Sequence, residues 1–422
     1  MQPWIPLTLT VRTPMFLGAD ADSPAELRMP SLRGVARFWF RALAAPVFDA
    51  DDHRAVARAE AEVFGAAAGS GAGMTGPSPV AFRLVRIPRP DTNPSPRWLR
   101  MPVDAARPDH GIGYLLGQGL YQPASEAEGR PHPQLARRSH LPPDEDAVFA
   151  VRVAPGRRNG APAQDYVREV VGISLWAAAT FGGLGARTHR GFGGFDLDGL
   201  GALCAAAAAA AGPARGHPAI RRLHELVAER HHRHLPGLSA PPPLGAGGAP
   251  WPSAPTWTRW HVQTSGRTGT WPQLLHQAGR ALRAFRAPVD RTAPPHSMTG
   301  LSRYKRWVTR EYIDAVVPGL RGQPPASRTA PAASFGLPVV FGKAAAINLR
   351  KGGEELRRAS PLWIRTSRRP DGKYQLLYHV FEAAIGPGGA DITLSTTNRN
   401  EPLHLNEPLA YQAIADFLAT AP

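Results

Sequence analysis

A proline- and glycine-rich segment near the middle of the chain limits what the sequence can fold into. Residues 236–255 read PGLSAPPPLGAGGAPWPSAP. Proline has no amide hydrogen to donate, so this segment does not lie inside a helix or a central strand. We therefore expect two domains, residues 1–235 and 256–422, joined by a linker at 236–255. Related stretches at 65–79, 88–108 and 322–333 are expected to be long loops.

The first half shows a regular order of strand and helix patterns. Residues 4–12 alternate between apolar and polar, which is typical of a half-buried strand. Asp20 and Asp22 follow as turn residues, and Ser31 is the expected N-cap of the first helix. The predicted strands are 4–12, 80–87, 147–153 and 195–197, and the predicted helices are 32–45, 51–64 and 165–181. Apart from the helix at 51–64, the order is β-α-β-β-α-β, which is that of a ferredoxin-like or RRM-like domain.

The second half is less regular but compatible with a further copy of the same order. Strands are expected at 256–263, 337–341, 360–366 and 374–381, and helices at 271–286 and 407–419, with Asn406 as the cap of the last helix. The predicted fold class is therefore α+β, with tandem ferredoxin-like (RRM-like) domains, a glycine-rich loop and long loop insertions.

The chain is strongly basic. It has 49 Lys and Arg residues against 33 Asp and Glu residues, a formal net charge of +16. Only four of the basic residues are lysine (Lys305, Lys343, Lys351 and Lys373), which is typical of a GC-rich genome. Codon bias explains arginine in place of lysine, but it does not explain the excess of base over acid. An excess of this size favours a polyanionic partner such as nucleic acid.

Composition also indicates the compartment. Cys204 is the single cysteine, so no internal disulfide forms, and a reducing cytoplasm fits. The first residues lack the pattern of a signal peptide, and the apolar run at 203–211 is too short to span a bilayer. We expect a cytoplasmic protein without membrane contact.

Three arginines recur along the first predicted helix. Arg33, Arg37 and Arg41 are spaced four residues apart, so they share one helix face, and no acidic residue lies three or four positions from any of them. We interpret this arginine stripe as a phosphate-binding surface; the alternative is a solvated helix face. The neighbouring Phe38, Trp39 and Phe40 are expected in the core rather than as base-stacking platforms.

A second candidate site is the glycine-rich loop, residues 181–195 (FGGLGARTHRGFGGF). Gly183, Gly185, Gly191 and Gly193 let the backbone approach a phosphate and present its amides to an anion. Arg187, His189 and Arg190 are expected to add donors and positive charge. No Gly-Lys-Ser/Thr follows, so this is not a Walker loop.

Catalysis is an alternative role for one of these residues. His189 has the chemistry of a general base, although a histidine among arginines is expected to bind phosphate instead. His231, His232 and His234 have no acidic or cysteine ligand at suitable spacing, so they indicate a solvated helix end rather than a metal site.

These motifs together carry a family resemblance. Residues 13–19 (TPMFLGA), 27–43 (LRMPSLRGVARFWFRAL) and 182–195 (GGLGARTHRGFGGF) resemble the RAMP superfamily of CRISPR proteins, and within it the first-numbered RAMP subunit of the Cmr-type (type III-B) effector. The segment that begins with Arg357 and Arg358 (RRASPLW) resembles a C-terminal part of that family.

The resemblance implies a non-catalytic, RNA-binding structural subunit without a cofactor. It implies contact with CRISPR guide RNA or target RNA near the guide 3′ end, and neighbouring RAMP subunits as partners, while cleavage belongs to other subunits. Two alternatives stay open: a RAMP endoribonuclease that processes CRISPR transcripts, and another RAMP subunit such as the repeating backbone.

Overall fold

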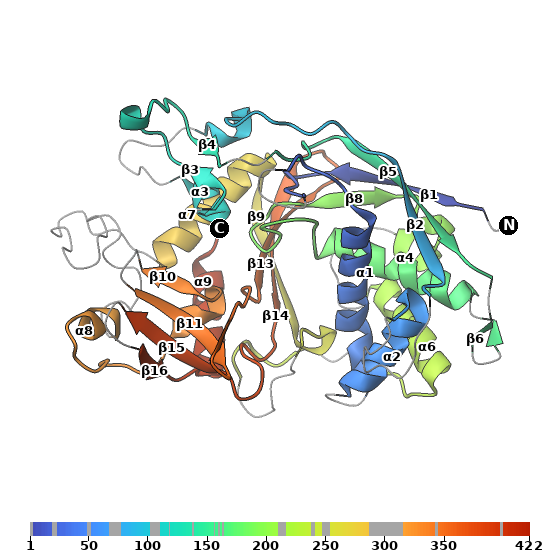
Figure 1. Ribbon diagram of the computed structural model, residues 1–422. Helices are drawn as coiled ribbons and strands as arrows, with labels where there is room; N and C mark the ends of the chain where they lie inside the picture. The colour runs from blue at the N-terminus through green and yellow to red at the C-terminus, as the bar shows by residue number, and fades with distance from the viewer. Residues whose placement is uncertain are drawn as a thin grey trace.

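The computed structural model describes most of the chain. The described residues are 3–18, 23–48, 52–66, 77–101, 110–117, 119–136, 139–155, 157–158, 161–162, 164–209, 217–237, 241–246, 254–286, 315–341, 345–396 and 400–422. Asp20 and Asp22 lie outside them. The helices and strands form a mixed α+β arrangement in which every sheet is antiparallel (Figure 1).

The first sheet contains the four strands predicted in the first half. They are β1 Ile5–Val11, β2 Val80–Arg86, β5 Asp146–Val153 and β8 Phe195–Asp198, in the order β2-β5-β1-β8. Leu7, Leu9 and Val11 lie on one face and are at most 1% exposed. They face α1 (Met29–Ala44) and α4 (Gln164–Thr180), which cover that side of the sheet (Figure 1). The three further helices beside them are α2 His53–Phe64, α5 Ala205–Ala208 and α6 Pro218–His231.

The start of α1 differs from the prediction. Ser31 is not the N-cap, because the helix begins at Met29 and Arg28 occupies the capping position without a side-chain hydrogen bond. Pro30 stands in the first turn, where a missing amide hydrogen breaks no helical bond. Proline therefore marks this helix start in place of a capping hydroxyl.

A central three-stranded sheet belongs to the second half. Its strands are β9 Trp260–Gly269, β13 Leu362–Arg368 and β14 Tyr374–Phe381, in the order β13-β14-β9. The predicted strand at 256–263 was wrong at its start, where Trp257–Arg259 form a 3-10 helix. One face of the sheet packs toward α1 and α4; the other packs against α7 (Trp271–Arg286) and α9 (Glu407–Thr420) (Figure 1).

A third sheet was almost entirely missed from the sequence. It follows the order β10-β11-β15-β16, with β12 paired to β11, and the sequence predicts only its edge strand β10. The strands are β10 Val339–Phe341, β11 Ala345–Lys351, β12 Glu354–Leu356, β15 Asp391–Thr396 and β16 Asn400–Leu403. The described second half is therefore more than a second copy of the first.

The remaining described elements are short. They are the helices α3 Gly111–Leu116 and α8 Val317–Leu320, the strands β3 Tyr121–Gln122, β4 Gln134–Leu135, β6 Arg157–Arg158 and β7 Ala161–Pro162, and the 3-10 helices at Ala45–Val47, Arg97–Leu99, Glu126–Glu128, Leu200–Ala202 and Pro331–Phe335. Although α3 belongs to the first half, it packs on α7, where a Cβ at Gly111 would lie 1.9 Å from the carbonyl oxygen of His276.

The hydrophobic core crosses between the halves. The Trp39 ring lies 5.8 Å from the Trp363 ring and 5.4 Å from the Phe381 ring, and Phe181 contacts Trp257 of the second half. The division at 236–255 therefore stays a prediction. In the described helices, none is long and apolar enough to cross a membrane.

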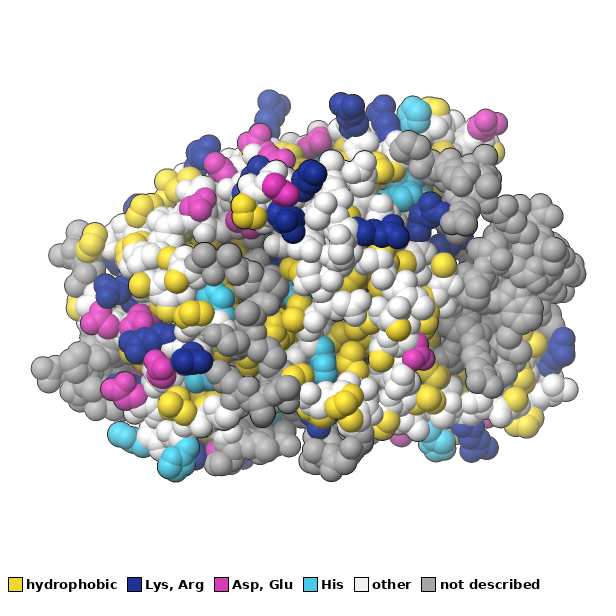
Figure 2. All heavy atoms as spheres, turned by 180° about the vertical axis from the view of Figure 1, so that it is seen from behind, with side chains coloured by type: hydrophobic (Ala, Val, Ile, Leu, Met, Phe, Trp, Pro, Cys, Tyr) yellow, Lys and Arg dark blue, Asp and Glu magenta, His cyan; other side chains and the backbone are white. Residues whose placement is uncertain are grey.

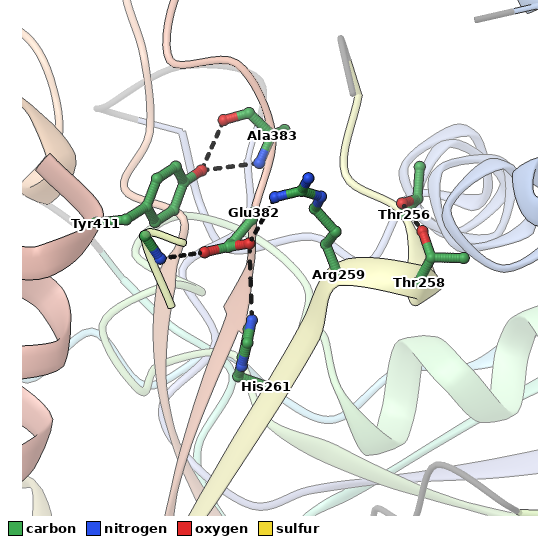
Figure 3. Close-up of polar contacts among 8 residues, drawn as sticks. Thr256, Thr258, Arg259, His261, Glu382, Ala383 and Tyr411 are labelled. Atoms are coloured by element: carbon green, nitrogen blue, oxygen red, sulfur yellow. Dashed lines mark hydrogen bonds and ion pairs between the residues drawn. The ribbon is translucent and has the colours of Figure 1, made fainter. Parts of the chain in front are cut away.

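Part of the predicted linker is held in place by a buried carboxylate. Glu382 is 0% exposed and accepts a hydrogen bond of 2.9 Å from the backbone N–H of Gly245. The same carboxylate pairs with Arg259 at 3.3 Å and lies 3.7 Å from His261, while Tyr411 bonds to the backbone of the next residue (Figure 3). This segment of the linker thus packs against the second half.

Candidate functional site

A pocket of ≈ 380 Å³ lies where three separate parts of the chain meet. One wall comes from α1, one from the glycine-rich loop, and one from residues 358–363 at the start of β13. The lining residues are Ser31, Gly34, Val35, Phe38, Trp39, Gly183, Gly185, Thr188, His189, Pro255, Arg358, Ala359, Ser360, Pro361, Trp363 and Phe381. Each of the three walls carries one of the motifs singled out in the sequence.

The pocket face of α1 is not its arginine face. Ser31, Gly34 and Phe38 occupy positions i, i+3 and i+7, so they lie on one side of the helix. Phe38 is half-buried, with its ring centroid 5.3 Å from Trp39 and 6.4 Å from Trp363. Trp39 and Phe40 are core residues as predicted, although Trp39 also borders the pocket, whereas the half-buried Phe38 is a wall of the pocket.

The arginine stripe has an acidic partner after all. Glu60 of α2, whose side chain is 6% exposed, pairs with both Arg37 and Arg41, the latter at 2.8 Å. Arg33 donates to the backbone carbonyl of Val80 at 3.3 Å and lies over the Phe82 ring. The expectation of an unpaired stripe was wrong, because the compensating carboxylate comes from another helix rather than from the next turn.

The glycines of the loop have two different roles. Gly183 and Gly185 line the pocket. Gly191 and Gly193 are buried, and the Gly193 amide donates to the Pro14 carbonyl at 2.9 Å. Gly193 has a φ of +70°, and a Cβ there would lie 2.0 Å from the Leu184 carbonyl oxygen. The Gly191 amide likewise donates within the loop, to Thr188. Neither of these two amides is available to an anion.

His189 is neutral in this structure. Its ring stacks on Trp363 with centroids 3.5 Å apart, and its Nδ1 lies 2.6 Å from the Ser360 carbonyl oxygen. Burial lowers the pKa of His189 to about 3, so the imidazole carries no charge at neutral pH. The expected positive charge on His189 was wrong. A carbonyl only accepts hydrogen bonds, so Nδ1 carries the proton and Nε2 is left as an acceptor.

Arginines around the loop differ in how firmly they are held. Arg190 donates to the Phe335 carbonyl at 2.8 Å, and burial lowers its pKa to about 10. Arg187 is exposed within the loop, with its guanidinium beside Gly117. Arg357 is exposed next to the half-buried Arg358 that lines the pocket. The loop itself is joined to the second half, because the amide of Ile364 donates to the His189 carbonyl at 3.1 Å.

The histidines at the end of α6 do not form a metal site with their described neighbours. His231 is half-buried 3.9 Å from Glu62, whereas His232 and His234 are exposed. Within the described ranges, no group of three or more His, Cys, Asp or Glu side chains is arranged to hold a metal ion.

Positive charge is spread over the surface. Figure 2 shows Lys and Arg side chains at several places on one face, interleaved with Asp and Glu on one side, while hydrophobic side chains gather in the middle. The net charge of +16 is thus not concentrated in one patch of that face.

Sequence reasoning missed several pocket residues: Ser31, Gly34, Phe38, Thr188, Ser360 and Trp363. The helical spacing of Ser31, Gly34 and Phe38 is a signal in the sequence, because it places the three residues on one side of the helix. The contribution of Ser360 and Trp363 had no local signal, because it depends on how the two halves meet.

Comparisons with known proteins agree with this architecture. The model of the RAMP superfamily matches residues 8–196. No curated protein sequence matches the chain. The crystal structure of Cmr1 from Pyrococcus furiosus in its apo form is similar, with a TM-score of 0.50 and 18% identity over 90% of this chain and 88% of that chain.

Two cryo-EM structures of the type III-B Cmr-beta bound to cognate target RNA also match. One includes AMPPnP and ssDNA (TM-score 0.46, 12% identity, 99% of each chain), and the other does not (TM-score 0.45, 11% identity, 99% of this chain and 100% of that chain). The likeness to Cmr1 concerns the fold. Over residues 8–196, a little under half of its length, the chain is similar to the RAMP superfamily.

Proposed function

We propose that this protein is a non-catalytic, RNA-binding structural subunit of a type III-B CRISPR effector, and that the pocket holds part of an RNA strand. The observation that carries the proposal is the meeting of α1, the glycine-rich loop and residues 358–363 around one pocket. The guide RNA, the target RNA and other RAMP subunits are the partners implied by the family, with contact near the guide 3′ end.

The proposed fold is consistent with this role. In the first half the sheet order β2-β5-β1-β8 is the one that a ferredoxin-like β-α-β-β-α-β chain adopts. In the second half β9, α7, β13, β14 and α9 follow the same order without a fourth described strand in that sheet. We therefore retain tandem ferredoxin-like domains as the proposed architecture, with the third sheet as an insertion.

The chemistry of the pocket favours the base or ribose of a nucleotide over its phosphate. Val35, Phe38 and Trp363 provide apolar and aromatic walls, and aromatic rings stack with any base. The Nε2 of His189 is an acceptor, so it suits a base N–H or a ribose 2′-hydroxyl and repels a phosphate oxygen. Arg358 lines the same pocket and supplies a donor beside it.

A nuclease role has little support from these residues. A general base works best when its pKa lies near the working pH, and the pKa of His189 is about 3. Its Nδ1 is also occupied by Ser360. No described carboxylate or second histidine lines the pocket.

Filling the pocket tests the proposal. Gly34 is exposed at the pocket wall, and a Cβ there has nothing within 4 Å. Gly34→Phe should weaken binding of a fluorescein-labelled single-stranded RNA by about tenfold or more, because one stacked base contributes about 1–3 kcal/mol. The thermal midpoint should not fall, since phenylalanine is a better helix former than glycine.

The matched control is Gly388→Phe, an exposed turn glycine that also has open space around it. Both variants and the wild type should leave the RNA intact after incubation with and without Mg²⁺. Equal affinity of Gly34→Phe and wild type would remove the pocket from the binding site. Cleavage that is lost in His189→Ala would favour the endoribonuclease alternative.

A further inference from the structure

The first sheet has an open face opposite its helices, and one corner of that face is basic and aromatic. Trp4 precedes β1, and the guanidinium carbons of Arg83 and Arg152 each lie 4.6 Å from the centroid of its ring. Arg83 is exposed on the edge strand β2, whereas Trp4 and Arg152 are half-buried. Ala150 pairs with Arg83 across the strands and is 2% exposed.

These two arginines are oriented but not neutralised. In the part of the chain that the structure describes, no carboxylate forms an ion pair with Arg83 or Arg152. A guanidinium that stacks on an indole uses its flat face and leaves its in-plane N–H donors free for a bidentate contact. Two like charges held on one ring repel each other, and an anion between or beside them removes that repulsion.

The rest of the open face limits what binds there. Asp196 of β8 and Asp146 of β5 lie opposite Thr10, toward the far end of the strands, and Asp198 lies opposite Thr8 on the edge strand β8. Arg12 at the far end is already paired with Asp144 and Asp196. The central positions carry Thr8 and Val148 rather than aromatic rings. A nucleic acid therefore cannot lie across the whole face in the manner of an RRM, where bases stack on the central strands.

We propose that Trp4, Arg83 and Arg152 form a second RNA contact, which rests on the proposed RNA-binding function, binds backbone phosphodiesters and is separate from the pocket. The pocket lies on the helix side of the sheet, as does Phe82, whose ring is covered by Arg33 of α1. The corner lies on the opposite side. The two sites thus hold two different stretches of RNA, or one strand that passes around the β2 edge.

Charge reversal at the corner tests this inference. The double variant Arg83→Glu with Arg152→Glu should weaken binding of the labelled RNA. The slope of log affinity against log salt should become shallower by about 1.4, because each phosphate contact with a single strand contributes about 0.7. The control is Arg368→Glu with Arg369→Glu, which changes the net charge equally. Both arginines are exposed: Arg368 ends β13, and Arg369 begins the turn to β14, where it pairs with Asp371 at 3.4 Å. The control should change the slope much less.

Further variants separate a loss of RNA contacts at the corner from a loss of folding, and separate the corner from the pocket. Arg83→Ala with Arg152→Ala shows whether a loss of folding, measured by thermal unfolding, accounts for weaker binding. A slope equal to that of the control in both double variants would overturn the proposal. Gly34→Phe is measured in parallel: if it has no effect while the corner variants do, the pocket fails and the corner stands. Binding that is normal in the corner variants but weak in Gly34→Phe gives the reverse result.

Discussion

Glu60 changes the interpretation of the arginine stripe, because it pairs with two of the three arginines. Its carboxylate is nearly buried and bonds to both Arg37 and Arg41, although it is 23 and 19 residues away from them in the sequence. A buried carboxylate needs such partners, because an unpaired charge in the interior is costly. At least two of the three arginines therefore join α1 to α2. Their ion pairs reduce the positive charge that the stripe has available to bind a polyanion.

Arg37→Glu is accordingly expected to destabilise the protein. The new carboxylate would face Glu60, and an attraction would become a repulsion, at a cost of about 1–3 kcal/mol because Arg41 still pairs with Glu60. The free energy of unfolding in urea measures this. Arg58→Glu, an exposed change on α2 outside this pair, should remain within about 0.5 kcal/mol of wild type. A stability of Arg37→Glu equal to wild type would mean that the ion pair contributes nothing.

At the scale of elements, the glycine-rich loop works as a connector as well as a wall. Its His189 carbonyl accepts from Ile364 at the edge of β13, and Arg190 reaches the Phe335 carbonyl of the second half. The bond from Ile364 covers part of the edge of β13, and proteins seldom leave a strand edge bare, whereas Phe335 ends a 3-10 helix. The loop therefore combines a binding surface, at Gly183 and Gly185, with an anchor, at Arg190.

Arg187 and Arg190 should therefore behave differently when each is changed to alanine. Arg190→Ala is expected to lower the free energy of unfolding by about 1–2 kcal/mol. The change removes a half-buried donor, so the Phe335 carbonyl loses its hydrogen bond. Arg187→Ala, an exposed change, should stay within about 0.5 kcal/mol and weaken RNA binding instead. Urea unfolding and RNA titration of both variants check this. Equal stabilities of the two variants would contradict the anchoring role of Arg190.

The elements of the first half could be predicted because their side-chain periods are strong. β1 alternates cleanly, and α4 buries most of its length, so both patterns survive in the sequence alone. The third sheet left weaker signals. β11 (AAINLRK) begins with alanines that favour a helix, β15 is short, and β16 carries Pro402, which fits only an edge strand. Such strands form because neighbouring strands offer them partners.

Individual residues of the candidate site could be predicted from sequence motifs, but the contacts between distant segments that form the pocket could not. The glycine-rich loop and Arg358 were identified from motifs, and both lie at the pocket. The low pKa of His189 could not be inferred, because its main cause is burial, and the Trp363 ring that stacks on His189 comes from far along the chain. The pairing of Arg37 with Glu60 was hidden for the same reason.

On the scale of the whole molecule, the two halves share their interior. Trp39 and Phe181 of the first half pack against Trp363, Phe381 and Trp260 of the second. Arg365 of β13 is 6% exposed and donates to the Ala179 carbonyl at 2.8 Å, in the last turn of α4, where a cation also matches the helix dipole. The boundary between the halves is thus a core and not a surface contact.

We expect the full chain to unfold in one thermal transition rather than two. Aromatic cores of this kind couple the halves, since separating them exposes several large side chains to water. Differential scanning calorimetry of the wild type measures this, with Trp363→Ala as the variant that weakens the shared core. Two well-separated transitions in the wild type would instead support independent domains at 1–235 and 256–422.

The residues that line the pocket extend along the chain from Ser31 to Phe381, so the ribosome synthesises them at very different times. A ribosome makes the α1 wall early and the Trp363 and Phe381 wall near the end. While the chain is being translated, the glycine-rich loop has no β13 edge to pair with, and His189 has neither its stacking ring nor its carbonyl. The nascent chain therefore lacks a complete pocket and cannot bind RNA there during translation. Only a chain that has been synthesised at least to Phe381 and folded acquires one.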